Sequence, residues 1–315
     1  MKKLKVNLYG KDTEPSNGVS NRYKTSKFAF QQPALHYVVG SRGQGKSRLT
    51  SKILSQAQKE KTFDVIYLIS PSFESNRAYF GKLINENNVF KPTKESIQQV
   101  IDRVDEDRDE FEEHLRLLEE YKRFNDILKS GREMTDDELS RYIVFGFLDE
   151  DFEKPVFKYE EAAGVLRVPT SCVVLDDVLG SRALCQSSGI DKLCSLNRHI
   201  SPLSQPFGDR SACGLAVYIL SQTYRCPNGI GRLVRENITH LTLFKNKQNK
   251  QVDLIKDELA STIEEDKFMN ALEYSTNKKY GNLTITFTPP CPTHTFRSNL
   301  NELLIFDGME CSCGR

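Results

Sequence analysis

The sequence contains no tryptophan, and its 315 residues carry a formal net charge of only +1. Without tryptophan, any stacking on nucleic-acid bases would have to come from Tyr, Phe or Arg side chains. With so little net charge, the whole molecule is not a basic platform for nucleic acid. Any contact with DNA must therefore come from local patches or from an assembled ring.

Long hydrophobic runs are also missing. The longest apolar runs have the length of β-strands, which is too short to cross a membrane. The polar segment that begins with Met1, Lys2 and Lys3 has no apolar stretch of the kind found in signal peptides. We therefore expect a soluble, intracellular protein with no membrane partner.

The chain has eight cysteines, but no two of them form a C-x-x-C pair. Five are scattered through the predicted core and three lie near the C-terminus: Cys172, Cys185, Cys194, Cys213 and Cys226, then Cys291, Cys311 and Cys313. This distribution is typical of reduced thiols in a reducing compartment. A zinc site formed by Cys291, His294, Cys311 and Cys313 is the alternative.

Strand-length apolar runs alternate with helical patterns along most of the chain. The predicted strands are 36–39, 64–69, 171–177, 214–220 and 238–244, and the predicted helices are 48–59, 191–197 and 230–236. The strands are continuously apolar, as a parallel sheet covered on both faces requires. The pattern predicts an α/β protein with a doubly wound, mainly parallel sheet.

Composition divides the chain into three parts. We expect a flexible N-terminal arm over 1–30, a core domain over 31–250 and a C-terminal α/β appendage over 251–315. A charged insertion at about 74–161 interrupts the core, and Val104, Phe111, Leu115 and Leu118 recur at helical spacing within it. The insertion is therefore predicted to be helical, with either a solvated surface or a partner-binding role.

The most informative motif is a complete G-x-x-x-x-G-K-[ST] phosphate-binding loop, the Walker A pattern of P-loop NTPases. It comprises Gly40, Ser41, Arg42, Gly43, Gln44, Gly45, Lys46 and Ser47. A strand precedes it and a helix follows it, so backbone N–H groups and the helix dipole can surround a phosphate. Lys46 would reach the β- and γ-phosphates of ATP, and the Ser47 hydroxyl would bind Mg²⁺.

Acidic and amide side chains follow two other predicted strands. Asp176 and Asp177 end the strand at 171–177 as a Walker B element, in which Asp176 would bind Mg²⁺ and Asp177 would act as general base. Alternatively, Asp177 merely caps a turn. Gln222 follows the strand at 214–220, where it would orient water beside the γ-phosphate or be an ordinary turn residue.

Three arginines follow Gln222 in the sequence: Arg225, Arg232 and Arg235. An arginine near a nucleotide can stabilise the charge of the transition state, often from a neighbouring subunit. The alternative for each of the three is an ordinary surface arginine. Lys245, Lys247 and Lys250 are candidate contacts to DNA phosphates or members of a solvated turn.

Taken in order, these motifs resemble the viral DNA-packaging ATPases of the FtsK–HerA group, as found in large DNA viruses of eukaryotes, virophages and polinton-like elements. The resemblance covers roughly residues 35–246. It is carried by the loop at 40–47, the Asp176–Asp177 pair, Arg198-His199, Ser221-Gln222 and Arg235-x-Asn237.

The resemblance implies a RecA-like core and an oligomeric ring, with a hexamer favoured. It also implies ATP-driven movement of double-stranded DNA into a viral capsid, in the host cell, at a virus assembly site or associated with the virion. Lys46 and Ser47 then match the nucleotide and metal positions, Asp176 the Mg²⁺ position and Asp177 the catalytic carboxylate. Gln222 matches the polar sensor, and Arg235 the candidate arginine finger acting in trans. Many relatives have Glu at the position of Asp177.

Three alternatives stay open at this point. A P-loop GTPase is indicated by Asp177-x-x-Gly180 and by Asn246-Lys247-Gln248-Asn249, although Asn249 lacks the carboxylate that would bind guanine. A small-molecule kinase would need an arginine-rich lid, whereas the insertion is acidic. A protein that binds nucleotide without hydrolysis would have no need for the intact set of Lys46, Ser47, Asp176 and Asp177.

Overall fold

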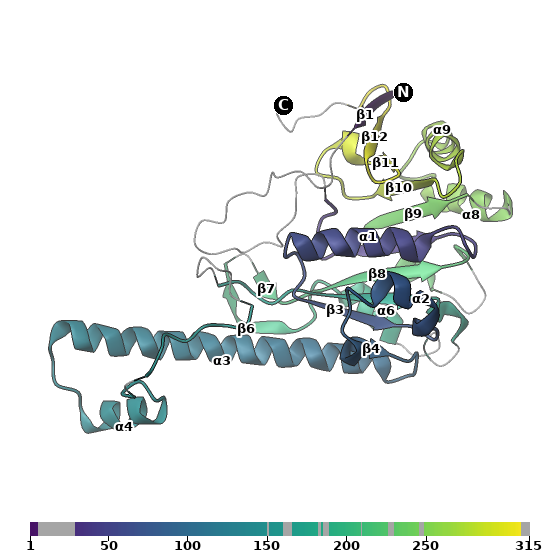
Figure 1. Cartoon of the computed structure of the whole chain (residues 1–315). Coiled ribbons are helices and arrows are strands. Elements are labelled where there is room, and N and C mark those ends of the chain that lie inside the picture. Colours follow the sequence, from purple (N-terminus) through teal and green to yellow (C-terminus); the bar gives the residue numbers. More distant parts are fainter. Residues whose placement is uncertain are drawn as a thin grey trace.

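The computed structural model describes residues 1–5, 29–149, 151–159, 166–181, 184, 189–208, 210–225, 230–245 and 249–309. Its centre is a ten-stranded sheet in the order β1-β12-β11-β10-β9-β2-β8-β5-β3-β4. A smaller antiparallel pair is formed by β6 (Pro202–Phe207) and β7 (Arg210–Ala212). Helices lie against both faces of the large sheet, and one long helix extends beyond it (Figure 1).

Five parallel strands form the middle of the sheet: β2 (Leu35–Val39), β3 (Val65–Ile69), β5 (Ser171–Asp176), β8 (Leu215–Ser221) and β9 (His240–Phe244). Every residue of β2, β5, β8 and β9 is buried. This explains why the strands read as continuous apolar runs. Since β8 lies between β2 and β5 and all three are parallel, the residues that follow these strands lie together at the C-terminal ends of the strands. This end is called the C-terminal edge of the sheet.

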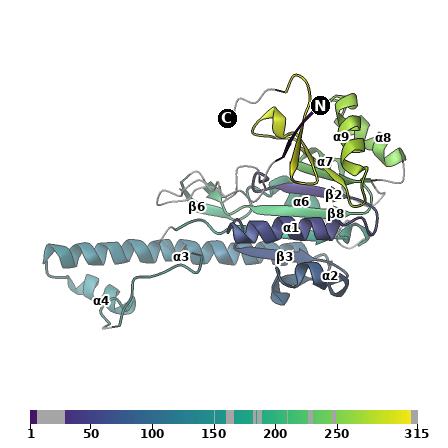
Figure 2. The same ribbon diagram turned by 45° about the horizontal axis from the view of Figure 1, so that its top comes forward.

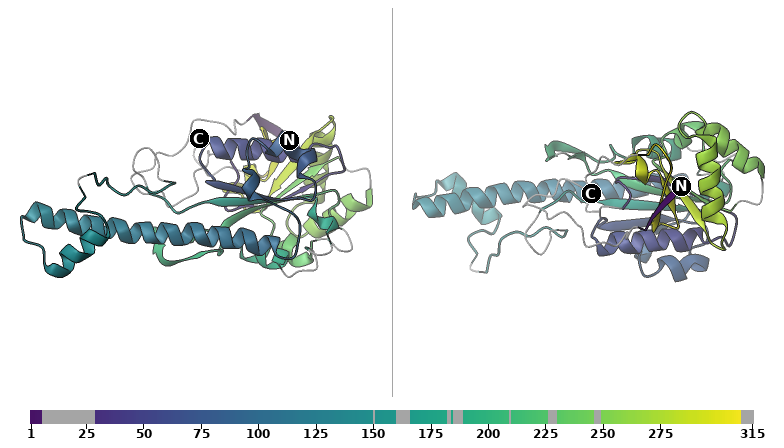
Figure 3. Two further views of the ribbon diagram at one scale, coloured as in Figure 1. Left: turned by 60° about the horizontal axis from the view of Figure 1, so that its bottom comes forward. Right: turned by 90° about the horizontal axis from the view of Figure 1, so that it is seen from above.

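Neighbouring side chains on each strand belong to two different cores, as the alternation of a strand requires. Val38 and Leu68 pack with residues of α1 (Lys46–Lys59) and α2 (Phe73–Phe80). Val39 and Ile69 pack on the other face with α3 (Ser96–Ser130), α6 (Gly189–Leu196) and α7 (Arg232–Glu236). The left view of Figure 3 shows α1 and α3 on opposite sides of the sheet. The predicted doubly wound, mainly parallel α/β fold is confirmed.

The C-terminal region continues the same sheet in antiparallel fashion. After α8 (Asn249–Leu259) and α9 (Glu265–Thr276), the strands β10 (Asn282–Thr286), β11 (Phe296–Ser298) and β12 (Glu302–Ile305) extend it beyond β9. A short helix at Pro292–His294 precedes β11. The predicted appendage is therefore bound to the core by a ladder of strands, as the yellow strands above β9 show in Figure 1. Figure 2 shows the same yellow strands beside α9.

Two predicted boundaries differ from the structure. Residues Lys2–Lys5, placed in a flexible arm by the sequence, form strand β1 and pair with β12 at the sheet edge. Strand β4 (Val89–Phe90), placed in the insertion, follows a short helix at Glu86–Asn88 and pairs with β3 at the opposite edge. The partner of β1 lies near the other end of the sequence, and β4 has only two residues. Local composition therefore reveals neither strand. The rest of the predicted arm, 6–28, lies outside the described residues.

The insertion contains helices, as predicted, but its main helix extends well beyond residues 104–118, which showed the helical spacing. Helix α3 has 35 residues and α4 (Asp136–Val144) returns beside its far end. The first half of α3 buries Ile97, Val104 and Phe111 against the sheet. The second half forms a separate core from Phe124, Ile127, Tyr142 and Phe147. In the described part of the chain, neither α3 nor any other helix combines the length and apolarity of a membrane span.

Candidate nucleotide-binding site

The phosphate-binding loop joins the end of β2 to the start of α1. Glycine is required at three of its positions for steric reasons. A Cβ atom on Gly40 would lie 2.8 Å from the Cβ of Phe244, while Gly43 and Gly45 have φ angles of 78° and 99°. Only glycine adopts such angles without strain. The loop is also tied to β8, because the backbone N–H of Gly40 donates to the carbonyl of Ser221 at 3.0 Å.

Lys46 lies inside this loop. Its Nζ donates to the carbonyl of Gly40 at 2.7 Å and to that of Ser41 at 3.5 Å. Burial lowers the pKa of Lys46, and the carboxylates of Asp177 and Asp176 oppose this shift. A partly desolvated ammonium group that donates to carbonyl oxygens can exchange them for phosphate oxygens, which bind a cation more strongly. Ser47 lies in the first turn of α1, half-buried, and Arg42 is exposed on the loop.

Asp176 ends β5 and is buried. Its Oδ2 accepts hydrogen bonds from the amide of Asn76 at 2.6 Å and from the hydroxyl of Ser70 at 3.4 Å. Burial raises the pKa of Asp176, and the negative charge of Asp177 raises it further. Neither Ser70 nor Asn76 was predicted as a site residue. Ser70 directly follows β3, and its position at the end of a core strand was the available signal.

Asp177 takes the left-handed conformation, with φ of 53° and ψ of 30°, and its backbone N–H donates to the carbonyl of Leu220 at 3.2 Å. Its side chain does not cap the short helix at Val178–Gly180 that follows, which contradicts the alternative role as a turn cap. Instead, the carboxylate accepts two hydrogen bonds from the amide of Gln222. A strained backbone at this point is typical of a functional position.

The structure therefore brings the loop, Asp176, Asp177 and Gln222 to one edge of the sheet, at the ends of β2, β5 and β8. The three arginines are placed differently. Arg235 has a side chain only 7% exposed, and its guanidinium group is paired with Glu258 at 2.9 Å. Arg232 is exposed and pairs with Glu236. Arg225 is exposed beside the end of β8.

Oxygen ligands for a magnesium ion are present at this edge. Ser47 offers a hydroxyl and Asp176 a carboxylate, and the hydrogen bonds from Ser70 and Asn76 both fall on Oδ2 of Asp176. Hard oxygen donors and a crowded pair of carboxylates suit a divalent cation. No group of three or more His, Cys, Asp or Glu side chains suited to a metal occurs among the described residues. Of the alternative zinc set, Cys311 and Cys313 lie outside them, while the Cys291 thiol lies 3.2 Å from the Thr293 hydroxyl.

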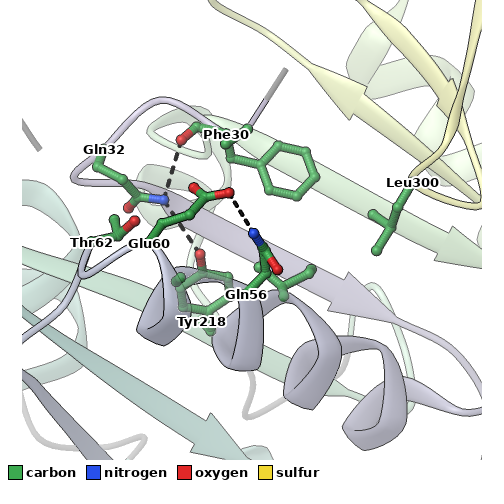
Figure 4. Close-up of a pocket in the computed structure, with 10 residues that line it drawn as sticks. Phe30, Gln32, Gln56, Glu60, Thr62, Tyr218 and Leu300 are labelled. Atoms are coloured by element: carbon green, nitrogen blue, oxygen red, sulfur yellow. Dashed lines mark hydrogen bonds between the residues drawn. The ribbon is translucent and has the colours of Figure 1, made fainter. Parts of the chain in front are cut away.

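A small cavity of about 40 Å³ lies beneath the other end of α1 (Figure 4). Phe30, Gln32, Gln56, Glu60 and Tyr218 are among its lining residues, and the Gln32 amide donates to the Tyr218 hydroxyl at 3.4 Å. Gln56 is about 15 Å along the helix from Lys46. This cavity is too small for a nucleotide and does not belong to the phosphate-binding loop.

No protein-family model matches the chain, and no curated protein matches it. It is similar to the genome packaging NTPase B204 from Sulfolobus turreted icosahedral virus 2 in complex with AMPPCP. That similarity has 11% identity and a TM-score of 0.43, over 85% of this chain and 98% of that chain.

The chain is also similar to the pCW3 conjugation coupling protein TcpA with ATPγS (14% identity, TM-score 0.38, 77% of this chain, 58% of that one). EssC (ATPases 2 and 3) from Geobacillus thermodenitrificans is similar at 14% identity and a TM-score of 0.35, over 68% of this chain and 32% of that one. This chain thus spans less than two thirds of the TcpA and EssC structures.

Proposed function

We propose that this protein is an ATP-driven translocase of double-stranded DNA that packages a viral genome into a capsid. The observation that carries the proposal is the meeting of Lys46, Asp176, Asp177 and Gln222 at the ends of three adjacent strands. A phosphate-binding loop alone would serve many proteins that only bind nucleotide. A loop facing a carboxylate and an amide is suited to hydrolysis, because hydrolysis needs groups that orient water.

In this proposal, the loop N–H groups and Lys46 hold the triphosphate and stabilise the charge that develops on it. Asp177 accepts a proton from the attacking water, and Gln222 holds the Asp177 carboxylate in position. Ser47 and Asp176 would hold Mg²⁺, whose charge would neutralise the phosphate oxygens when it is bound. Asp177 is one methylene shorter than the glutamate at this position in many proteins of the family it resembles.

The DNA, ring and capsid parts of the proposal rest on the motif resemblance. Lys245 follows β9 and is exposed, and Lys250 is exposed on α8, so both can reach a DNA phosphate. Lys247 lies outside the described residues. A hexameric ring would bring together such lysines from every subunit. The ring could therefore make many phosphate contacts although a single chain has little net charge. The protein would then act in the host cell, at a virus assembly site or with the virion.

A phosphate-release assay tests the proposal. We expect release from ATP that rises when duplex DNA is added, and no release from the Lys46→Ala variant. Stimulation should fall steeply with added salt if phosphate contacts bind the DNA. Lys59→Ala, at the exposed far end of the same helix, is a control for the loss of a positive charge. Turnover of GTP in preference to ATP would replace the proposal with the GTPase alternative. Turnover that survives Lys46→Ala would remove the site from the reaction.

A further inference from the structure

An open groove of about 390 Å³ adjoins the phosphate-binding loop on the side of β9 and β10. Its walls come from the start of α1, the end of β9 and the turn before β10. They include Gly45, Arg48, Phe244, Tyr280, Asn282 and Asn301. Because Gly45 belongs to both the loop and the groove, a triphosphate held by the loop has this groove directly beside it.

Aromatic side chains line the passage from the loop to the groove. A Cβ atom on Gly45 would lie 3.5 Å from the Cδ1 of Tyr280 and 3.9 Å from the Cε1 of Phe244. Phe244 is buried and packs against the loop at Gly40, whereas Tyr280 is 46% exposed. An exposed aromatic ring in van der Waals reach of the loop offers a stacking surface for a nucleobase.

The backbone holds Tyr280 in this place. Tyr280, Asn299 and Leu300 have φ angles of 66°, 52° and 68°, and all three line the groove. Next to Tyr280, a Cβ atom on Gly281 would lie only 2.3 Å from the carbonyl oxygen of Ser275, so the turn is packed tightly against the end of α9. Clustered left-handed conformations of this kind are typical of binding sites, where strain fixes a side chain for its ligand.

The groove has a positive lining that also carries amides. Arg48, Lys52 and Lys279 line it, together with three asparagines, and no described residue of the lining is Asp or Glu. The positive charge suits an anionic nucleotide. Guanine presents two adjacent N–H donors, which call for a carboxylate, whereas the amino group and ring nitrogen of adenine match an asparagine amide. Asn282 is 4% exposed, and its Nδ2 donates to the Tyr280 carbonyl at 3.3 Å and to the Asn299 Oδ1 at 3.4 Å. Its Oδ1 has no hydrogen-bond partner among the described residues and can accept from the amino group of adenine.

We propose that this groove binds the adenosine part of ATP, with the base stacked on Tyr280 and read by the asparagine amides. The inference rests on the proposed ATP site and deepens it, because it names the residues that select the base. It also gives the strands added beyond β9 a role in nucleotide binding, since Tyr280 lies in the turn before β10 and Asn282 is the first residue of that strand.

Calorimetric titration with Mg-ATP, Mg-GTP and Mg-tripolyphosphate tests the proposal. We expect Tyr280→Ala to weaken ATP binding about tenfold, because one stacked base contributes roughly that factor. Tripolyphosphate has no base, so its affinity should stay within about twofold. Tyr280→Phe keeps the ring and should bind ATP like the wild type. Tyr79→Ala, which removes a tyrosine 42% exposed on α2, is the matched control.

The possible results separate the two proposals. Wild-type protein that binds neither ATP nor tripolyphosphate would overturn the nucleotide site itself. Wild-type protein that binds ATP, with Tyr280→Ala binding it equally well, would overturn only the groove proposal. Equal affinity of the wild type for ATP and GTP would overturn the adenine assignment. If Tyr280→Ala bound ATP like the wild type but bound duplex DNA more weakly, the groove would be assigned to nucleic acid instead. Unchanged tripolyphosphate binding shows that the variant is folded.

Discussion

The amide Nε2 of Gln222 donates to both carboxylate oxygens of Asp177, at 3.1 and 3.0 Å. Gln222 follows β8 and Asp177 follows β5, so the two bonds join the ends of adjacent strands. Because Asp177 is exposed and its backbone is in the left-handed region, this amide is the contact that directs its carboxylate.

Gln222→Ala should therefore lower kcat for ATP hydrolysis about 10- to 100-fold, since a misdirected base loses part of its contribution to the reaction. The affinity for ATP should change by less than about threefold, because the Gln222 amide donates to Asp177, whereas Lys46 and the loop N–H groups hold the phosphates. Steady-state kinetics and a binding titration give the two values. Gln56→Ala, at the far end of α1, is the control. A wild-type kcat in Gln222→Ala would show that the contact is dispensable.

Asp177→Asn separates binding from hydrolysis. The amide has almost the same shape as the carboxylate but cannot accept a proton, so the variant should bind ATP and fail to cleave it. We expect kcat to fall at least about 100-fold, the usual contribution of a general base. Phosphate release measured at saturating ATP is the test. Undiminished turnover would remove Asp177 from the mechanism.

The sequence predicted the central strands because both of their faces are buried, which makes each one a continuous apolar run. It did not predict β1, whose residues Lys2–Lys5 are mostly polar and whose partner β12 lies at the other end of the chain. The length of α3 was also missed, because its second half packs on α4 and not on the sheet. Short antiparallel strands such as β11, with three residues, have too few positions to show a period.

The site likewise contains residues that belong to a local sequence pattern and residues that only long-range packing brings to it. Lys46, Asp176 and Gln222 were predicted because each belongs to a motif at the end of an apolar strand. Asn76 was not, because it lies on α2 and reaches Asp176 only through the packing of that helix. Tyr280 likewise belongs to no motif, and the antiparallel pairing of β10 with β9 carries it toward the loop. Contacts made by long-range pairing have no local pattern from which to predict them.

Asp176→Asn should stabilise the protein without ligand while it impairs its chemistry. Burial and the nearby charge of Asp177 raise the pKa of Asp176, so its ionised form is unfavourable in the folded state near neutral pH. An asparagine removes that cost and can still accept the hydrogen bond from Asn76. We expect a melting temperature about 2 °C higher at pH 7.5, with Mg²⁺-dependent turnover lost.

A calorimetric scan and an ATPase assay test this trade-off. The gain in melting temperature should shrink at low pH, where Asp176 itself becomes protonated and its cost disappears. Asp149→Asn, an acidic residue on the insertion, is the control. A lower melting temperature in Asp176→Asn at pH 7.5 would contradict the role assigned to the charge.

The buried histidines of β2 and β9 should make the fold sensitive to acid. His36 is fully buried, its Nε2 lies 2.7 Å from the Thr242 hydroxyl, and burial followed by the charge of Arg297 lowers its pKa to about 3. The pKa of His240 is lowered for the same reasons, with His36 contributing. Below pH 6.5 these two histidines bind protons in the unfolded chain but stay neutral in the folded core. The contribution of these neutral histidines to the free energy of unfolding is therefore fully present above pH 6.5 and is lost progressively as the pH falls toward 3.

Between pH 6.5 and 5, His36 alone should account for a loss of about 1 to 2 kcal/mol in the free energy of unfolding. Urea titrations at the two pH values measure it. In His36→Leu this share of the loss should disappear, while Thr242 keeps its hydrogen bond to Thr284 at 2.7 Å. His199→Leu, which removes an exposed histidine, is the control. An unchanged pH dependence in His36→Leu would contradict the assignment.

Arg235 is held by Glu258 in this structure, so its proposed role as an arginine finger acting in trans requires it to leave that partner. Its Nε and Nη2 donate to the two carboxylate oxygens at 3.0 and 2.9 Å, and its Nη1 donates to the carbonyl of Ile230 at 2.6 Å. These contacts join α7 to α8. Arg235→Ala should destabilise the fold by about 2 kcal/mol, because it leaves the partly buried Glu258 without its counter-charge.

Mixed rings distinguish a purely structural arginine from a finger. A ring that combines Arg235→Ala subunits with Lys46→Ala subunits contains some sites with an intact loop facing an intact Arg235. If Arg235 acts in trans, the mixture should regain ATPase activity that neither variant has alone. Glu258→Gln weakens the same ion pair but leaves the arginine in place, so it should share the loss of stability and keep its activity. Because a structural role predicts no recovery at any mixing ratio, activity measured across ratios decides between the two.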